Sequence, residues 1–136
     1  MYIVIDFDGT CVTHEYPAIG REIGATRILR ALVDAGHRLI LFTMRSDDPK
    51  NKQLLLTDAV NWFRERGIPL YGIQTNPTQK YWTASPKAYG ELYIDDAALG
   101  CPLVYPEDGS RPYVNWSKVG ELLEDLLIPE ETEILN

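Results

Sequence analysis

The sequence predicts an α/β domain in which a parallel β-sheet is covered by helices. Short apolar runs that are typical of buried strands alternate with stretches whose apolar residues recur at helical spacing. This alternation indicates βαβ units with right-handed crossovers, and such units build a parallel sheet. Because the 136 residues contain no internal repeat, low-complexity stretch or linker, we expect one domain over residues 1–136.

The first strand and helix lie near the N-terminus. Tyr2 to Ile5 is a run of mostly β-branched residues that ends at Asp6, as expected of a strand buried on both faces. From about Arg21, apolar residues recur at helical spacing up to Gly36, a residue type that commonly follows a helix C-terminus. The apolar positions of this predicted helix are Ile23, Ile28, Leu29, Leu32 and Val33.

The same pattern is repeated in the next segment. Leu39 to Phe42 predicts a second buried strand that ends at Thr43, and a second helix closes at Gly67. Ile68 to Ile73 predicts a third strand. The apolar residues of the second helix, which we expect to lie in the core, are Leu55, Ala59, Trp62 and Phe63.

A polar loop precedes the remaining elements. Residues 74–83 read as a loop, and Ser85-Pro86 supplies an N-cap and a first-turn proline for a short helix. This helix would lead into a fourth strand at Leu92 to Ile94. An apolar run at 103–105 and a turn at 106–109 then precede a last helix, expected from about Trp116 to Leu127.

Composition excludes several classes of protein. The net charge of −7 argues against non-specific nucleic-acid binding, which needs clustered Lys and Arg. No apolar run reaches the ~18 residues of a membrane span, and the N-terminus lacks the basic region of a signal peptide, so we expect a cytoplasmic protein without membrane contact. Cys11 and Cys101 fit neither a disulfide framework nor a zinc spacing, and both are expected to be reduced thiols.

Chemistry-bearing side chains follow the predicted strands. Asp6 and Asp8 are two residues apart in extended chain, so their carboxylates would lean to the same side, about 6.5 Å apart. Asp95 and Asp96 follow the fourth strand, and Thr43 follows the second. Ligands bind at the carboxyl ends of strands in open α/β sheets, and clustered carboxylates there favour a hard cation such as Mg²⁺. A carboxylate beside such a cation can attack phosphorus to form an aspartyl-phosphate.

Four segments, taken in order, resemble the motifs of the haloacid dehalogenase (HAD) superfamily of phosphatases and phosphotransferases. They are Asp6-Phe7-Asp8-Gly9-Thr10, Leu39-Ile40-Leu41-Phe42-Thr43, Lys87 and Tyr93-Ile94-Asp95-Asp96. The ordered set lies within residues 2–96 and is far more specific than any one motif. The resemblance implies a three-layer Rossmann-like fold and Mg²⁺-dependent hydrolysis of a phosphate monoester.

The resemblance also implies roles for individual residues. Asp6 would be the nucleophile and a metal ligand, and Asp8 the general acid/base, with its backbone carbonyl on the metal. Asp96 would be the other protein ligand of the metal. Asp95 would act through a water molecule or by contacting the metal ligands instead of the metal. Thr43 and Lys87 would hold the phosphoryl group, and Gly9 and Thr10 would help to bind the phosphorylated substrate.

The sequence leaves several assignments open. Lys80 competes with Lys87, which we prefer because it would start the helix that feeds the acidic strand. Arg45 is close enough to Thr43 to bind a substrate anion, but a surface ion pair with Asp47 or Asp48 is an equal alternative. Cys11 replaces the usual aliphatic residue after the first motif, and His14, in the segment that follows, is expected to be merely exposed. Tyr81 and Trp82 would either line the substrate site or pack the polar loop down.

Two other functions would use similar residues. A response-regulator receiver also uses carboxylates, Mg²⁺, Thr and Lys, but its acceptor Asp follows the third strand, where this chain has Ile73-Gln74. A catalytically silent phosphate-binding or regulatory protein on the same fold is opposed by the intact Asp6 and Asp8.

The intervals between the motifs are too short for a cap domain. Residues 11–38 are occupied by a flap and one helix, and residues 44–86 by a helix, a strand and a loop. We therefore expect either a homo-oligomer or loop 74–83 to cover the site, or a monomer that acts on macromolecular phosphates.

Overall fold

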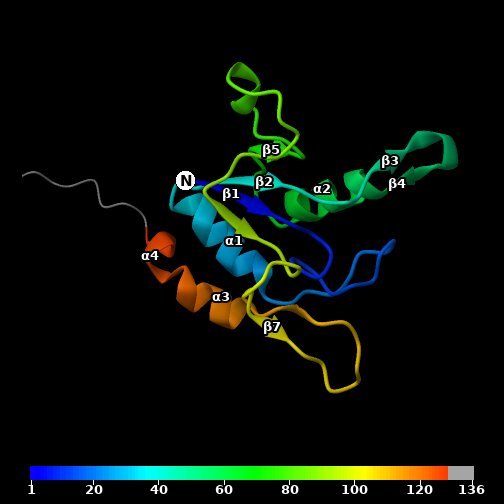
Figure 1. Ribbon diagram of the computed structural model, residues 1–136. Helices are drawn as coiled ribbons and strands as arrows, with labels where there is room; N and C mark the ends of the chain where they lie inside the picture. The colour runs from blue at the N-terminus through cyan, green and yellow to red at the C-terminus, as the bar shows by residue number, and fades with distance from the viewer. Residues whose placement is uncertain (129–136) are drawn as a thin grey trace, which may run out of the picture.

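A four-stranded parallel sheet forms the centre of the computed structural model, which describes residues 1–128; residues 129–136 of the predicted domain lie outside this part (Figure 1). The strands are β1 (Tyr2–Ile5), β2 (Arg38–Leu41), β5 (Gly72–Ile73) and β6 (Leu92–Ile94), in the order β5-β2-β1-β6. All three pairings are parallel. The predicted α/β fold with a parallel sheet is confirmed.

Helices α1 (Ala25–Asp34) and α2 (Leu55–Glu65) cover one face of this sheet. They connect β1 to β2 and β2 to β5, and two successive right-handed crossovers in one direction place both helices on the same side. Alternate strand residues point into this layer. Its buried members include Ile3, Ile5, Leu39 and Leu41 from the strands, Leu29 and Leu32 from α1, and Trp62 and Phe63 from α2.

Two short helices near the C-terminus extend the same layer beside α1 (Figure 1). They are α3 (Trp116–Leu122) and α4 (Glu124–Leu127), so the last helix is divided at Leu123 instead of continuing from 116 to 127 as predicted. The Asn115 side chain caps α3 by accepting a hydrogen bond of 3.1 Å from the Lys118 amide. Trp116 and Val119 are buried and anchor α3 to the core.

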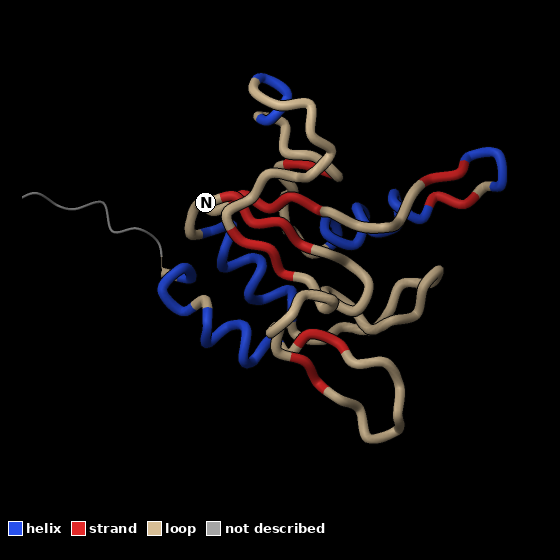
Figure 2. The backbone as a smooth tube through the Cα atoms, viewed as in Figure 1, coloured by secondary structure: helices blue, strands red, loops and turns tan. Residues whose placement is uncertain are grey.

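An irregular crossover, residues 74–91, covers the opposite face, where Val4, Ile40 and Ala88 form a small buried cluster. Figure 2 shows it as loop apart from one 3₁₀ turn, Gln79–Tyr81. The helix predicted after Ser85-Pro86 is therefore wrong. The Gln79 side-chain amide donates hydrogen bonds of 2.9 Å to the carbonyls of Ser85 and Lys87, and this arrangement replaces helical bonding.

Two predicted boundaries also differ from the structure. The first helix starts at Ala25 instead of Arg21, because Gly24 has a φ of 97°, a left-handed conformation that cannot be part of the helix. The third strand is confined to Gly72–Ile73. Ile68 is buried, but its amide bonds the Phe63 carbonyl at 3.0 Å and so closes α2 instead of joining the sheet.

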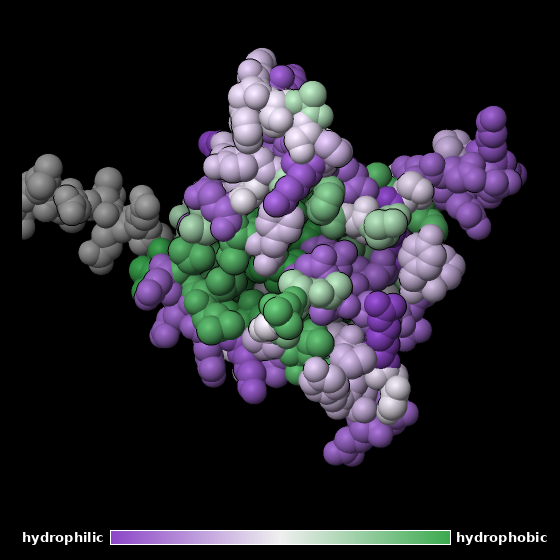
Figure 3. All heavy atoms as spheres, viewed as in Figure 1, coloured by the Kyte–Doolittle hydropathy of each residue, from purple (hydrophilic) through white to green (hydrophobic). Residues whose placement is uncertain are grey.

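Two hairpins extend from the core. One consists of β3 (Asp47–Asp48), a 3₁₀ turn (Pro49–Asn51) and β4 (Gln53–Leu54), and Figure 3 shows hydrophilic side chains over this projection. The other pairs β7 (Leu103–Val104) with β8 (Tyr113–Val114). Among residues 1–128, no helix combines the length and the apolar character that a bilayer crossing requires.

Candidate active site

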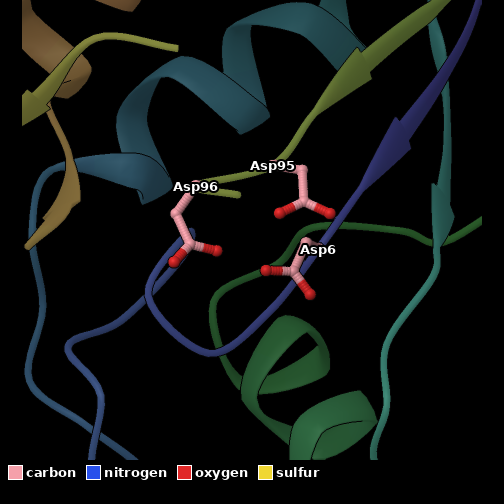
Figure 4. A group of neighbouring side chains, drawn as sticks. All are labelled: Asp6, Asp95 and Asp96. Atoms are coloured by element: carbon pink, nitrogen blue, oxygen red, sulfur yellow. The ribbon is translucent and has the colours of Figure 1, made fainter. Parts of the chain in front are cut away.

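Three carboxylates meet where β1 and β6 end (Figure 4). Ile5 pairs with Ile94 in parallel register, so Asp6 and Asp95 follow at the same level and Asp96 comes one residue later. One oxygen of each of the three carboxylates lies within 4.8 Å of the others. The structure thus brings together three of the sequence-predicted metal ligands, and their hard oxygen donors suit a cation such as Mg²⁺.

The environment of Asp6 disfavours its negative charge when no cation is bound. Burial of the side chain raises the pKa of Asp6 to about 8, and the charge of Asp95 acts in the same direction, while a hydrogen bond from Thr10 opposes both effects. At neutral pH the Asp6 carboxyl would therefore be mostly protonated. A divalent cation between the carboxylates would supply the missing positive charge and favour the ionised form.

Thr10 contacts two of the three carboxylates in the acidic cluster through its hydroxyl. Its side chain is fully buried, and its Oγ1 lies 2.8 Å from Asp6 Oδ2 and 3.2 Å from Asp96 Oδ1. The same oxygen accepts a hydrogen bond of 3.0 Å from the Asp96 amide. The Thr10 hydroxyl, expected from the sequence to help to bind substrate, is thus occupied in joining the two strand ends.

The loop that carries Thr10 is tied to the C-terminal part of the fold. The indole Nε1 of Trp116 donates a hydrogen bond of 2.7 Å to the Thr10 carbonyl, and the Val114 amide donates one of 2.9 Å to the Gly9 carbonyl. Both donors belong to buried residues. The loop therefore has a fixed position relative to β8 and α3.

His14 joins the cluster although the sequence predicted only an exposed side chain. Its Nε2 lies 2.9 Å from Asp96 Oδ2, and its side chain is only 13% exposed. Gly9 makes room for it: with a φ of 79°, a Cβ at Gly9 would lie 1.9 Å from His14 Nε2 and 2.7 Å from Asp96 Oδ2. The only sequence signal was the position of His14 shortly after the first motif.

Asp8 points to a different partner from Asp6. Both of its carboxylate oxygens accept hydrogen bonds from Arg45, from Nε and Nη2, each at 2.8 Å. Of the two alternatives for Arg45, the surface pair with Asp47 or Asp48 is not formed, since Arg45 is 1% exposed and Asp47 instead accepts from Thr57. The pairing of Asp8 with Arg45 was not apparent from the sequence because the two residues are 37 positions apart.

The segment after β2 is fixed by Gln74, a residue that no sequence motif assigns to the site. The Gln74 Oε1 accepts a hydrogen bond of 2.8 Å from the Thr43 amide, and its Nε2 donates to the carbonyls of Thr43 and Arg45 at 2.7 and 3.2 Å. The Thr43 Oγ1 accepts a bond of 3.2 Å from the Arg45 amide, which leaves its own proton available to a ligand.

The two candidate lysines lie on the irregular crossover, and both are exposed. Lys87 Nζ is 5.9 Å from the ring centroid of Tyr93, two residues before Asp95, whereas Lys80 Nζ is 5.2 Å from the ring of Tyr81. Within residues 1–128 neither lysine forms an ion pair with the acidic cluster. Lys87 is therefore linked to the acidic strand through Tyr93, and Lys80 is not.

The aromatic residues of the crossover extend away from the cluster. Tyr81 and Trp82 are 81% and 62% exposed. The Trp82 ring packs 5.3 Å from that of Tyr89, which in turn lies 5.8 Å from the ring of Tyr2 at the amino end of β1. Asp6 follows the opposite end of that strand.

Both cysteines are free thiols. Cys11 is fully buried beside the cluster, where its Sγ donates a hydrogen bond of 3.3 Å to the Asp6 carbonyl. Burial, with the nearby charge of Asp6 as a smaller cause, raises the pKa of the Cys11 thiol well above its usual value. Cys11 thus packs the first motif as a small apolar residue would.

The similarity of the chain to known proteins is seen in a solved structure. No protein-family model matches the chain, and no curated protein matches it. A solved structure, described as that of a conserved protein coded by a locus from Bacteroides thetaiotaomicron, has 33% sequence identity and a TM-score of 0.71. The similarity covers 92% of this chain and 90% of that one. The chain therefore belongs to the same family as this conserved Bacteroides thetaiotaomicron protein.

Proposed function

We propose that this chain is a cytoplasmic, Mg²⁺-dependent phosphohydrolase of the HAD type that cleaves a phosphate monoester. The observation that carries the proposal is the convergence of Asp6, Asp95 and Asp96 within 4.8 Å at adjacent strand ends. The elevated pKa of Asp6, about 8, supports it, because a half-buried cluster of carboxylates gains from a bound cation.

The donor set fits Mg²⁺, which prefers oxygen ligands and retains waters for a substrate phosphate. The carboxylates of Asp6 and Asp96 and the backbone carbonyl of Asp8 would hold it, with Asp95 beside them. When bound, the ion would neutralise the charge of the carboxylates and of the phosphoryl oxygens during transfer.

The protein groups would act in two steps. In the first, an Asp6 carboxylate oxygen attacks phosphorus, the bond from phosphorus to the ester oxygen breaks, and Asp8, protonated at the start of the step, gives its proton to the departing alcohol. In the second, water attacks the aspartyl-phosphate, Asp8 takes the water proton, and inorganic phosphate leaves with Asp6 regenerated. The Thr43 hydroxyl and the Lys87 ammonium would hold phosphoryl oxygens in both steps.

Purified protein assayed against a panel of phosphate esters tests this proposal. We expect hydrolysis with MgCl₂ and none with EDTA, and a phosphoenzyme that is absent from Asp6→Asn. Asp58→Asn, an exposed aspartate on α2, is the matched control and should keep the wild-type rate. Full activity in metal-free buffer would contradict the mechanism, and so would an Asp6→Asn rate above about a tenth of wild type, a barrier change under ~1.4 kcal/mol.

We further propose that the site is covered by a neighbouring subunit or by the bulk of a macromolecular phosphate substrate. The contacts of Trp82 and Tyr89 toward Tyr2 make the crossover a poor cover for Asp6. Light scattering combined with the ester panel is the test. A strict monomer with kcat/KM above about 10⁵ M⁻¹s⁻¹ on one small metabolite would contradict this part.

A further inference from the structure

We propose that Arg45 is a positioning residue that fixes the carboxylate of Asp8 and joins it to residues 11–23, the segment between the first motif and α1 that we call the flap. The inference rests on the proposed function, in which Asp8 transfers protons. It assigns Arg45 no contact with the substrate.

The guanidinium of Arg45 is fully engaged inside the protein. A guanidinium has five N–H donors. Here Nε and one N–H of Nη2 bind the two oxygens of Asp8 at 2.8 Å each. The other N–H of Nη2 binds the Ala18 carbonyl at 2.9 Å, and Nη1 binds the carbonyls of Pro17 and Leu55 at 3.2 and 3.3 Å. Every donor thus has a protein acceptor, which leaves none for a substrate anion.

Arg45 also lies between two aromatic rings. Its Cζ is 5.1 Å from the ring centroid of Phe7 and 5.3 Å from that of Tyr16. Phe7 belongs to the core and Tyr16 to the flap. Stacking of this kind favours a planar guanidinium over an ammonium, so lysine could reproduce the charge but neither the fork nor the stacking.

These contacts connect the flap to the first motif. The carbonyls of Pro17 and Ala18 belong to the flap, the Leu55 carbonyl to the start of α2, and Asp8 to the loop that follows β1. Because a buried cation is stable only while its partners remain, moving the flap away would remove acceptors from Arg45 and disturb Asp8. The position of Asp8 and the closure of the flap are therefore coupled through one side chain.

Steady-state kinetics of Arg45→Met and Arg45→Lys test the positioning role. If Arg45 orients Asp8, kcat should fall about 10²-fold in Arg45→Met with KM changed less than about threefold, since proton transfer is lost and phosphate binding is not. The kcat of Arg45→Lys should fall nearly as far as that of Arg45→Met. Arg38→Met is the matched control, because the Arg38 guanidinium also stacks on aromatic rings, 4.8 Å from that of Tyr71 and 6.0 Å from that of Tyr2. Arg38 lies at the amino end of β2, away from the flap and the acidic cluster, so this variant should keep the wild-type kcat.

A double variant separates positioning from general destabilisation. In an Asp8→Asn background, Arg45→Met should lower kcat by less than about threefold, because the group that it positions has already lost its proton-transfer role. Equal losses in the two backgrounds would overturn the inference. A rise in KM with unchanged kcat would also overturn the inference, since it would indicate that Arg45 binds the substrate.

Hydrogen exchange gives a readout that does not depend on activity. Amides of residues 13–21 should exchange at least about tenfold faster in Arg45→Lys than in wild type, while amides of β2 keep their protection. Unchanged exchange in the flap would overturn the coupling. A wild-type protein that hydrolyses no ester of the panel would instead contradict the proposed function, and the exchange result would still decide whether Arg45 joins the flap to Asp8.

Discussion

Replacing Gly9 with alanine should test whether His14 really occupies the space above the first motif. The backbone at Gly9 has a φ of 79°, a conformation that costs an L-residue roughly 1–2 kcal/mol. The new Cβ would also lie 1.9 Å from His14 Nε2, so the ring must move and lose its contact with Asp96. Overpacking of this kind costs about 1–3 kcal/mol.

Gly36→Ala supplies the matched reference. Gly36 has a φ of 98°, but a Cβ there would meet nothing within 4 Å, so only the backbone strain of roughly 1–2 kcal/mol applies. We expect Gly9→Ala to lower the free energy of unfolding by about 1–3 kcal/mol more than Gly36→Ala does. Urea unfolding in EDTA measures both losses, and equal m-values would show that the unfolded states are comparable.

A second background makes the test specific for His14. In His14→Ala, which removes the ring, the extra loss caused by Gly9→Ala should shrink by at least about 1 kcal/mol. If the losses of Gly9→Ala and Gly36→Ala agree within about 0.5 kcal/mol in the wild-type background, the ring is not held over Gly9 and the packing argument is refuted.

Three further outcomes are expected. Thr10→Val should lower the free energy of unfolding by about 1–3 kcal/mol, because the half-buried Asp96 amide loses its acceptor, whereas Thr26→Val, whose hydroxyl contact is exposed, should change it by less than about 0.5 kcal/mol in urea unfolding. Without metal, stability should fall as pH rises from about 4 to about 8, because the folded protein keeps a proton on Asp6 that the unfolded chain releases; Asp6→Asn should flatten this dependence in EDTA, and an unchanged slope would contradict the raised pKa. Lys87→Ala should reduce kcat/KM for an ester by about 10²-fold and Lys80→Ala by less than twofold, and the reverse order would assign the phosphoryl-binding role to Lys80.

The sequence predicted the sheet and the acidic cluster because both depend on local patterns. Buried strands such as Leu39 to Leu41 show as continuous apolar runs, and parallel strands bring the residues after them to one edge. This rule alone predicts that Asp6, Asp95 and Asp96 lie close together. The two helices beside the sheet have equally clear periodicity.

The features that were missed depend on contacts between distant residues. The helix expected after Ser85-Pro86 has a correct local start signal, but Gln79 binds the carbonyls that a helix would have used. For Arg45 the sequence indicates either a substrate anion or a surface pair with Asp47 or Asp48, whereas its partner in the structure, Asp8, is 37 positions away. The spacing of apolar residues does not predict individual contacts between distant side chains. The contact between His14 and Asp96 was missed for the same reason.

The hydrogen bond from Trp116 to Thr10 joins residues 106 positions apart, and this has a consequence for the order in which the protein is made. A ribosome releases the segment with Asp6 well before the helix with Trp116. A nascent chain that has reached Asp96 carries every motif, yet it lacks the indole and the Val114 amide that hold the loop of the first motif in place. Completion of the site during translation therefore waits for Val114 and Trp116, and a chain released only as far as Asp96 would not present an ordered acidic cluster to stray cations or phosphate esters.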